Sequence, residues 1–101
     1  MAEEAEKLTV LHNTAESRFE TRVAGELAVA EYVLAPGQII FTHTEVPEAL
    51  QGHGIANQLA RVALDYARDA GLQVVPRCPF IRAYIQRHPE YQPLVAPHQE
   101  H

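Results

Sequence analysis

The run Gln51-Gly52-His53-Gly54-Ile55-Ala56 is the stretch whose residue types most directly predict a binding site. It follows a strand-like segment that stops at Pro47, and a helical pattern begins after it. The first turn of a helix leaves its N–H groups unpaired, and the helix dipole adds partial positive charge there. The glycines let the backbone approach a phosphate closely, because neither has a Cβ atom. We therefore expect the backbone of residues 51–57, Asn57 included, to bind an anion.

Cys78 is the only cysteine of the chain and the second candidate for chemistry. It precedes Pro79, and proline favours the first position of a helix, so Cys78 is the expected N-cap. A helix N-terminus and a neighbouring cation such as Arg77 favour thiolate over thiol. The thiol could then act as a base or as a nucleophile. The alternative is a buried structural cysteine that packs like a small hydrophobe, which is the commoner state of a free cysteine.

His43 is a candidate base in the strand before the glycine run. Strict alternation puts His43 on one face with Phe41 and Glu45, while Thr44 faces the other way. A histidine there could accept a proton from a substrate amine or from Cys78. It could equally be a hydrogen-bonded histidine that lines the core. Glu45 is the rival base, although we favour a solvated carboxylate at the sheet edge for it.

The remaining histidines do not predict a metal site. None are spaced i, i+4 on a helix, and His98 and His101 fall in the C-terminal tail. His53, within the glycine run, would contact phosphate or water. Tyr84 lies on the apolar face of an expected helix, where an ordinary core tyrosine would keep its hydroxyl at the surface.

The first half of the chain predicts an antiparallel meander. Alternating apolar and polar residues indicate strands, and Ala24-Gly25 and Pro36-Gly37 are strong turn signals between them. Residues 13–17 read as a polar turn. The expected strands are 8–12, 18–23, 26–34 and 39–46.

The second half predicts a βαβ unit. Apolar residues recur at helical spacing from 55 to 70, and Gly71 is the expected residue after the helix. A short buried strand over 72–75 and a second helix over 79–87 follow. Strand, helix and strand imply a right-handed crossover and a parallel pair. Both parallel strands end at the same sheet edge, so Cys78 is expected near the glycine run. The helical residues expected to face the core are Ile55, Leu59, Val62, Ala63, Tyr66, Ala67 and Ala70.

The glycine run resembles the coenzyme A pyrophosphate loop of the GNAT superfamily of N-acetyltransferases, Gln/Arg-x-x-Gly-x-Gly/Ala, and matches it fully. The resemblance is to the minimal single-domain branch, whose members are about this long, and it implies an α/β GNAT-like fold. It implies that residues 51–57 hold the pyrophosphate of acetyl-CoA. The backbone of Val46 would pair with the pantetheine arm or polarise the thioester carbonyl.

The same resemblance implies catalytic roles. In the minimal branch, a cysteine in a P-x-C-P-F-like context, here Cys78, is the proposed acetyl carrier or base. Tyr84 would be the general acid for the departing coenzyme A thiolate. Larger members often take a glutamate base from the strand of Glu45. They also carry two helices between their first two strands, where this chain has only residues 13–17. Much of the usual acceptor-binding half is therefore missing, and the acceptor is either small or large enough to provide its own surroundings.

Composition limits the remaining possibilities. A chain of 101 residues predicts one domain, over 8–96, with flexible termini at 1–7 and 97–101. A formal net charge of −5 disfavours nucleic acid and anionic membranes as partners. A single cysteine excludes an intramolecular disulfide, and the acidic N-terminus lacks an apolar run. These features predict a cytoplasmic protein, present as a monomer or weak dimer.

The expected function is transfer of acetyl from acetyl-CoA to an unidentified amine, with Cys78 and His43 performing base or nucleophilic chemistry. A reactive Cys78 is the favoured interpretation. One alternative is a non-catalytic module that binds coenzyme A or acyl-CoA. A further alternative is a protein-interaction domain that uses the glycine run only structurally.

Overall fold

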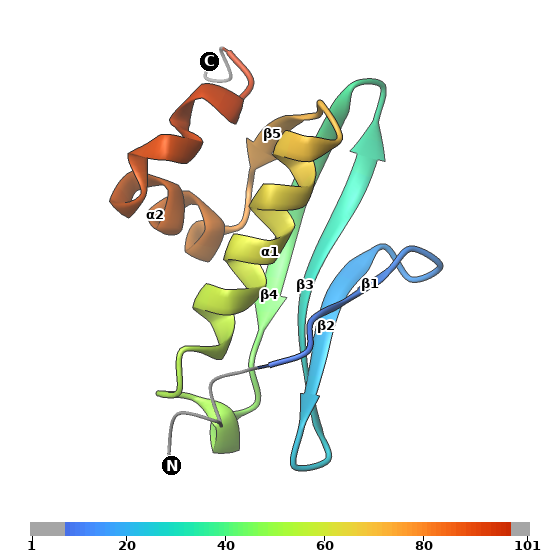
Figure 1. Cartoon of the computed structure of the whole chain (residues 1–101), viewed down its shortest axis with the longest axis vertical. Helices are drawn as coiled ribbons and strands as arrows, with labels where there is room; N and C mark the ends of the chain where they lie inside the picture. The colour runs from blue at the N-terminus through green and yellow to red at the C-terminus, as the bar shows by residue number, and fades with distance from the viewer. Residues whose placement is uncertain (1–7, 98–101) are drawn as a thin grey trace.

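Within residues 8–97, which the computed structural model describes, one sheet carries five strands in chain order from β1 to β5 (Figure 1). The first four strands are antiparallel, and β4 and β5 are parallel. This mixed α/β architecture, a meander followed by a βαβ unit, confirms the expected fold class. The elements are β1 Leu11–Asn13, β2 Arg18–Val23, β3 Glu26–Ala35, β4 Gln38–Glu45, η2 Glu48–Leu50, α1 Ile55–Asp69, β5 Gln73–Pro76, α2 Pro79–Arg87 and η3 Pro89–Leu94.

Two tight turns make the long hairpins of the meander. Ala24 and Gly25 join β2 to β3 with positive φ angles of 52° and 82°. Two consecutive positive φ angles match the right-handed twist of the flanking strands. Pro36 and Gly37 join β3 to β4, and Gly37 has a φ of 71°. Both turns lie where the sequence predicts them.

The βαβ unit brings the end of β5 beside the middle of β4. The parallel register runs from Gln38 opposite Gln73 to Phe41 opposite Pro76. Cys78 N–H then donates to Phe41 C=O at 2.8 Å, which extends the pairing beyond the strand. The predicted α2 starts at Pro79 as expected.

Some boundaries differ from the prediction. The first strand pairs over Leu11–Asn13 rather than 8–12, and β5 covers Gln73–Pro76 rather than 72–75. Residues 89–94, where prolines exclude an α-helix, form the 3₁₀ helix η3. The termini expected to be flexible lie outside the described residues, apart from Pro97. No helix in the described part of the chain is both long and apolar enough to cross a membrane.

A β-bulge in β4 corrects the predicted alternation around His43. Glu31 pairs with His43, but the next residue of β3, Tyr32, pairs with Phe41. Thr42 is therefore an extra residue on β4, and the residues after it face opposite to the simple alternation. Thr44, not His43, shares the face of Phe41, whose side chain is 1% exposed. The expectation that His43 shares the face of Phe41 is wrong for this reason.

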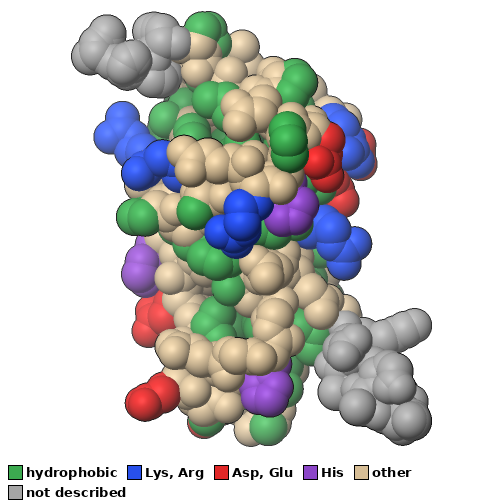
Figure 2. All heavy atoms as spheres, turned by 90° about the vertical axis from the view of Figure 1, so that its left-hand side faces the viewer, with side chains coloured by type: hydrophobic (Ala, Val, Ile, Leu, Met, Phe, Trp, Pro, Cys, Tyr) green, Lys and Arg blue, Asp and Glu red, His purple; other side chains and the backbone are tan. Residues whose placement is uncertain are grey.

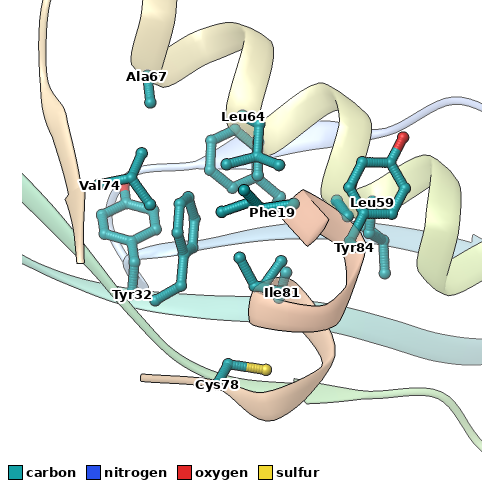
Figure 3. Packing of buried hydrophobic residues seen from close by; sticks show 14 of the residues in the cluster. Phe19, Tyr32, Leu59, Leu64, Ala67, Val74, Cys78, Ile81 and Tyr84 are labelled. Atoms are coloured by element: carbon teal, nitrogen blue, oxygen red, sulfur yellow. The ribbon is translucent and has the colours of Figure 1, made fainter. Parts of the chain in front are cut away.

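The core lies between the sheet and the two helices (Figure 3). Helix α1 contacts β2, β3, β4 and β5 as well as α2 and η3. Because it packs on two sides, its buried stripe is broader than the predicted face and includes Ala60 and Leu64. Tyr66 and Ala70, which the spacing places in the core, are exposed. The buried residues of α2 are Ile81, Tyr84 and Ile85, with Phe80 half-buried beside them, so Tyr84 lies on the apolar face as predicted.

Candidate functional site

The glycine run forms an open loop at the N-terminus of α1, which we call the cradle. Gly52 and Gly54 have φ angles of 88° and 76°, and Gly54 is the N-cap of the helix. The first helical bond runs from Gln58 N–H to Gly54 C=O at 3.1 Å, so the amides of residues 55–57 have no partner one turn earlier. Gly54 makes no side-chain cap, and the first turn carries no acidic residue. A Cβ atom at Gly52 or Gly54 would meet no atom within 4 Å, so the space beside both glycines is open.

A cavity of about 340 Å³ lies beside this cradle. It is bounded by the end of β4, the loop, the first turn of α1 and one aromatic side chain of α2. Seven of the eight residues that the sequence predicts to bind the cofactor line it; His53, the eighth, is exposed and does not. The lining residues are Val46, Leu50, Gln51, Gly52, Gly54, Ile55, Ala56, Asn57 and Phe80. We call this the loop cavity.

Gln51 links the two ends of the loop cavity through a hydrogen bond. Its side-chain amide donates to Val46 C=O at 3.1 Å and so ties the start of the loop to the end of β4. The carbonyl of Val46 is thus already hydrogen-bonded within the chain. The interaction holds the cradle and the strand end in a fixed relation.

Cys78 lies where the sequence predicts it, as the N-cap of α2, with its thiol turned into the core. Its Sγ is 3.3 Å from Thr44 Oγ1, and the residue is 3% exposed. The thiol lines neither the loop cavity nor the larger cavity described below. Thr44 was not among the predicted site residues. Only recognition of the bulge at Thr42 would have pointed to it, and no glycine marks that position.

His43 and Glu45 lie on the opposite face of the sheet from Thr44. The two side chains are 56% and 70% exposed, and His43 Nε2 is 3.4 Å from Glu45 Oε1. The structure therefore separates His43 from Cys78 rather than pairing them. Of its two suggested proton donors, a substrate amine can reach His43 directly, whereas the thiol faces away from it.

Tyr84 is buried between α2 and α1. Its ring stacks on His88 with centroids 4.0 Å apart, and the backbone carbonyl of Tyr84 lies 2.9 Å from His88 Nδ1. Burial raises the pKa of the Tyr84 phenol, with Arg61 of α1 opposing the change and Asp65 adding to it. Figure 3 shows the Tyr84 hydroxyl pointing away from Cys78.

A second and larger cavity, of about 570 Å³, lies beside the segment that leads into Cys78. It is bounded by β5, α2, η3 and Val95, which pairs with Val74 of β5. We call it the arginine cavity. Its lining residues are Val75, Pro76, Arg77, Arg82, Ile85, Gln86, Gln92 and Val95. Figure 2, viewed from the side of α2, shows exposed hydrophobic side chains across the middle of this face, with basic side chains among and above them.

The parallel β4–β5 pair, the glycine cradle at the start of α1 and the strand order are those of a GNAT-like α/β fold. The family model of the GCN5-related N-acetyl-transferases matches residues 18–94, so the chain belongs to this family.

Similar proteins support the same placement. The chain is 33% identical to Protein NATD1 of Mus musculus over 90 residues, which covers 86% of this chain and 82% of the mouse protein. It is 34% identical to Protein NATD1 of Homo sapiens over 85 residues, covering 81% and 75% of the two chains. The NMR solution structure of a GCN5-like protein from Staphylococcus aureus has the same fold, with a TM-score of 0.71, 23% identity and 93% of each chain covered.

Proposed function

We propose that this protein binds acetyl-CoA in the loop cavity and transfers the acetyl group to an amine. The observation that carries the proposal is the loop cavity itself. It joins a helix N-terminus free of acidic residues to the end of β4 through two glycines with positive φ. When bound, acetyl-CoA supplies an acetyl group activated as a thioester.

The loop residues would act by binding and orientation. The amides of residues 55–57 and the helix dipole would hold the two negative charges of a pyrophosphate. Phe80 and Val46 would give the pantetheine arm of the coenzyme an apolar wall. Gln51, bonded to Val46 C=O, would keep the cradle at a fixed distance from the strand end.

His43 is the base that the geometry favours for the amine. The transfer forms one N–C bond, breaks one C–S bond and releases one proton from the amine nitrogen. His43 is accessible, and Glu45 at 3.4 Å would stabilise the imidazolium that results. Glu45 thereby assists rather than competes. Both act from the face of the sheet opposite to Cys78.

Cys78 bears on the choice between a covalent route through an acetylated cysteine and direct attack of the amine on the thioester. Cys78 is 3% exposed and its thiol is hydrogen-bonded to Thr44. A covalent step through Cys78 would therefore first require this packing to open. Direct attack of the amine on the thioester needs no such opening. We therefore propose direct transfer as the main route. The Cys78–Thr44 pair would then hold the start of α2, with Phe80, against the loop cavity.

Tyr84 is the proposed proton donor to the leaving thiolate. It lies one helical turn after Phe80, which lines the loop cavity, and a tyrosine phenol is protonated at neutral pH. A donor of this kind would contribute within the 10²–10⁴-fold range typical of general acids.

Calorimetric titration with acetyl-CoA, followed by turnover with a panel of primary amines, tests the proposal. We expect saturable binding, and we expect His43→Gln to lower kcat by about 10²-fold or more while binding acetyl-CoA unchanged. Val33→Ala, a surface change on the same sheet face, is the control. Binding without turnover of any amine would favour a non-catalytic coenzyme A module, and absence of binding would overturn the proposal.

A further inference from the structure

The arginine cavity has the features of a small-molecule site that the loop cavity does not explain. Its volume of about 570 Å³ is within the range of ligand pockets. Val75, Ile85 and Val95 give it apolar walls. Arg77 and Arg82 add two guanidinium groups, and two glutamine amides complete the polar set. Apolar walls with a few polar groups are the usual composition of a site for an organic ligand.

Neither arginine of the cavity has an ion-pair partner among residues 8–97. The chain carries thirteen acidic residues and a net charge of −5. Yet no carboxylate of residues 8–97 lies within ion-pair distance of Arg77 or Arg82. A guanidinium matches the geometry of a carboxylate, and two of them on one cavity favour an anionic group there.

Arg82 is held in place by the backbone that leads to Cys78. Its Nε donates to Pro76 C=O at 3.4 Å and its second terminal nitrogen donates to Arg77 C=O at 3.1 Å. These bonds use two of the five N–H groups of the guanidinium. The remaining donors are available to a ligand, and the positioned fork loses less side-chain entropy on binding.

The arginine cavity is lined in part by a residue of the sheet face that carries His43. Val75, which lines the cavity, pairs with Ile40, so the two share a face opposite to Val74 and Ile39. After the bulge at Thr42, His43 also lies on this face. Phe41 is opposite Pro76, so strand spacings place the backbones of Arg77 and His43 within about 10 Å of each other.

We infer that the acetyl acceptor is a small amine that carries its own carboxylate, that is, an amino acid with an apolar side chain. The carboxylate binds Arg77 and Arg82, the side chain packs against Val75, Ile85 and Val95, and the amine lies toward His43 and Glu45. This inference rests on the proposed function, and it assigns a substrate class to the face where the acceptor enters. The arginine cavity would thereby take the place of the two helices that larger family members carry between their first two strands, where the described chain has none.

The test compares apolar L-amino acids with their carboxamides, which keep the amine and side chain and lose the negative charge. L-Leucine and L-leucinamide are the first pair, with the valine and phenylalanine pairs beside them. Acetyl-CoA is kept saturating, and N-acetyl product is measured by mass spectrometry. Binding is followed separately by the Nε–H NMR signals of Arg77 and Arg82, assigned with Arg77→Lys and Arg82→Lys.

We expect the acids to exceed the amides by about 10- to 100-fold in kcat/KM, as charge-assisted hydrogen bonds allow. Arg77→Gln should raise KM for the amino acid with little change in kcat or in KM for acetyl-CoA, and Arg77→Lys should restore part of the loss. Arg22→Gln, at the distant β2–β3 hairpin, removes the same charge and should change neither parameter.

Each contrary outcome has its own meaning. Equal use of acids and amides, or arginine signals that no amino acid in the panel shifts, overturns the inference while acetyl-CoA binding still stands. Preference for peptides with amidated C-termini overturns it in favour of a protein acceptor. Failure to bind acetyl-CoA overturns the proposed function first, and with it the acceptor role of the arginine cavity, even if amino acids still shift the arginine signals.

Discussion

Thr44 Oγ1 lies 3.3 Å from Cys78 Sγ, although 34 positions separate the two residues in sequence. The contact exists because the bulge at Thr42 turns Thr44 toward the helices, while β5 delivers Cys78 to the same edge of β4. The same bulge turns His43 to the other face. One extra residue in β4 thus separates the buried thiol from the accessible imidazole.

Thr44→Val should lower the free energy of unfolding by about 0.5–1.5 kcal/mol, because it removes the hydroxyl partner of a buried thiol and keeps the side-chain shape. Urea unfolding measures the change. Thr42→Val is the matched control, since the Thr42 hydroxyl bonds to Glu31 C=O at an exposed position. Equal losses for both variants would mean that the Thr44–Cys78 contact contributes nothing specific.

Gly54→Val should abolish the rise in Tm that acetyl-CoA gives the wild-type protein. A ligand that binds only the folded state stabilises it by mass action. Gly54 has a φ of 76°, where a β-branched residue is strained, and the added side chain would occupy the open space of the cradle. Gly54→Asn tolerates this φ far better and should retain part of the shift.

The control for strain alone is Gly25→Val in the β2–β3 turn, where φ is 82°. It should lower the Tm of the free protein yet leave the acetyl-CoA shift intact. If Gly54→Val folds and binds like the wild type, the cradle is not the phosphate site.

His12 should make stability depend on pH. Its Nε2 is 2.6 Å from the Tyr32 hydroxyl and its ring stacks on Phe19, and burial lowers the pKa of His12 below its ordinary value of 6.5. Below pH 6.5 the unfolded chain binds this proton and the folded chain does not, so stability falls as pH falls from 6.5 toward the lowered pKa. Urea unfolding between pH 8 and 5 should show a smaller decline for His12→Gln than for the wild type. A steeper decline in the variant would contradict this sign.

The α2 core face should be sensitive to truncation. Ile81→Ala and Ile85→Ala remove fully buried side chains and should each cost about 2–5 kcal/mol. Arg82→Ala should be tolerated far better, because its guanidinium bonds only to two backbone carbonyls at an exposed position. Small and equal losses at all three positions in urea titrations would show that α2 packs on another face.

Local signals explain which parts of the fold the sequence predicts. Gly25, Gly37 and Gly71 each adopt a positive φ angle that glycine tolerates, and all three turns lie as expected. The cysteine–proline pair likewise marks the start of α2. The glycine run is of the same kind, because the φ angles and the helix N-terminus that build the cradle are local properties.

Non-local packing explains what the sequence does not predict. The bulge at Thr42 depends on the register of β4 with β3, and no glycine or proline adjoins Thr42 in the sequence to indicate it. Leu64 is buried on a helix that also contacts α2 and η3, and periodicity within α1 cannot show these contacts. The arginine cavity combines β5, α2 and η3, so its lining residues have no common spacing in the sequence.

The last prediction concerns Cys78 itself. If the amine attacks the thioester directly, incubation with acetyl-CoA and no acceptor leaves the mass of the protein unchanged. A covalent route leaves one acetyl thioester on Cys78, which acid quenching preserves, hydroxylamine removes and Cys78→Ser abolishes. Because the thiol is buried and bonded to Thr44, we expect no adduct under native conditions. Thr44→Ala, which removes the hydroxyl partner and opens space beside the sulfur, is the informative companion. An adduct in Thr44→Ala alone would show that packing keeps a reactive thiol from the coenzyme. An adduct in the wild-type protein, formed and discharged as fast as turnover, would replace direct transfer with the covalent route.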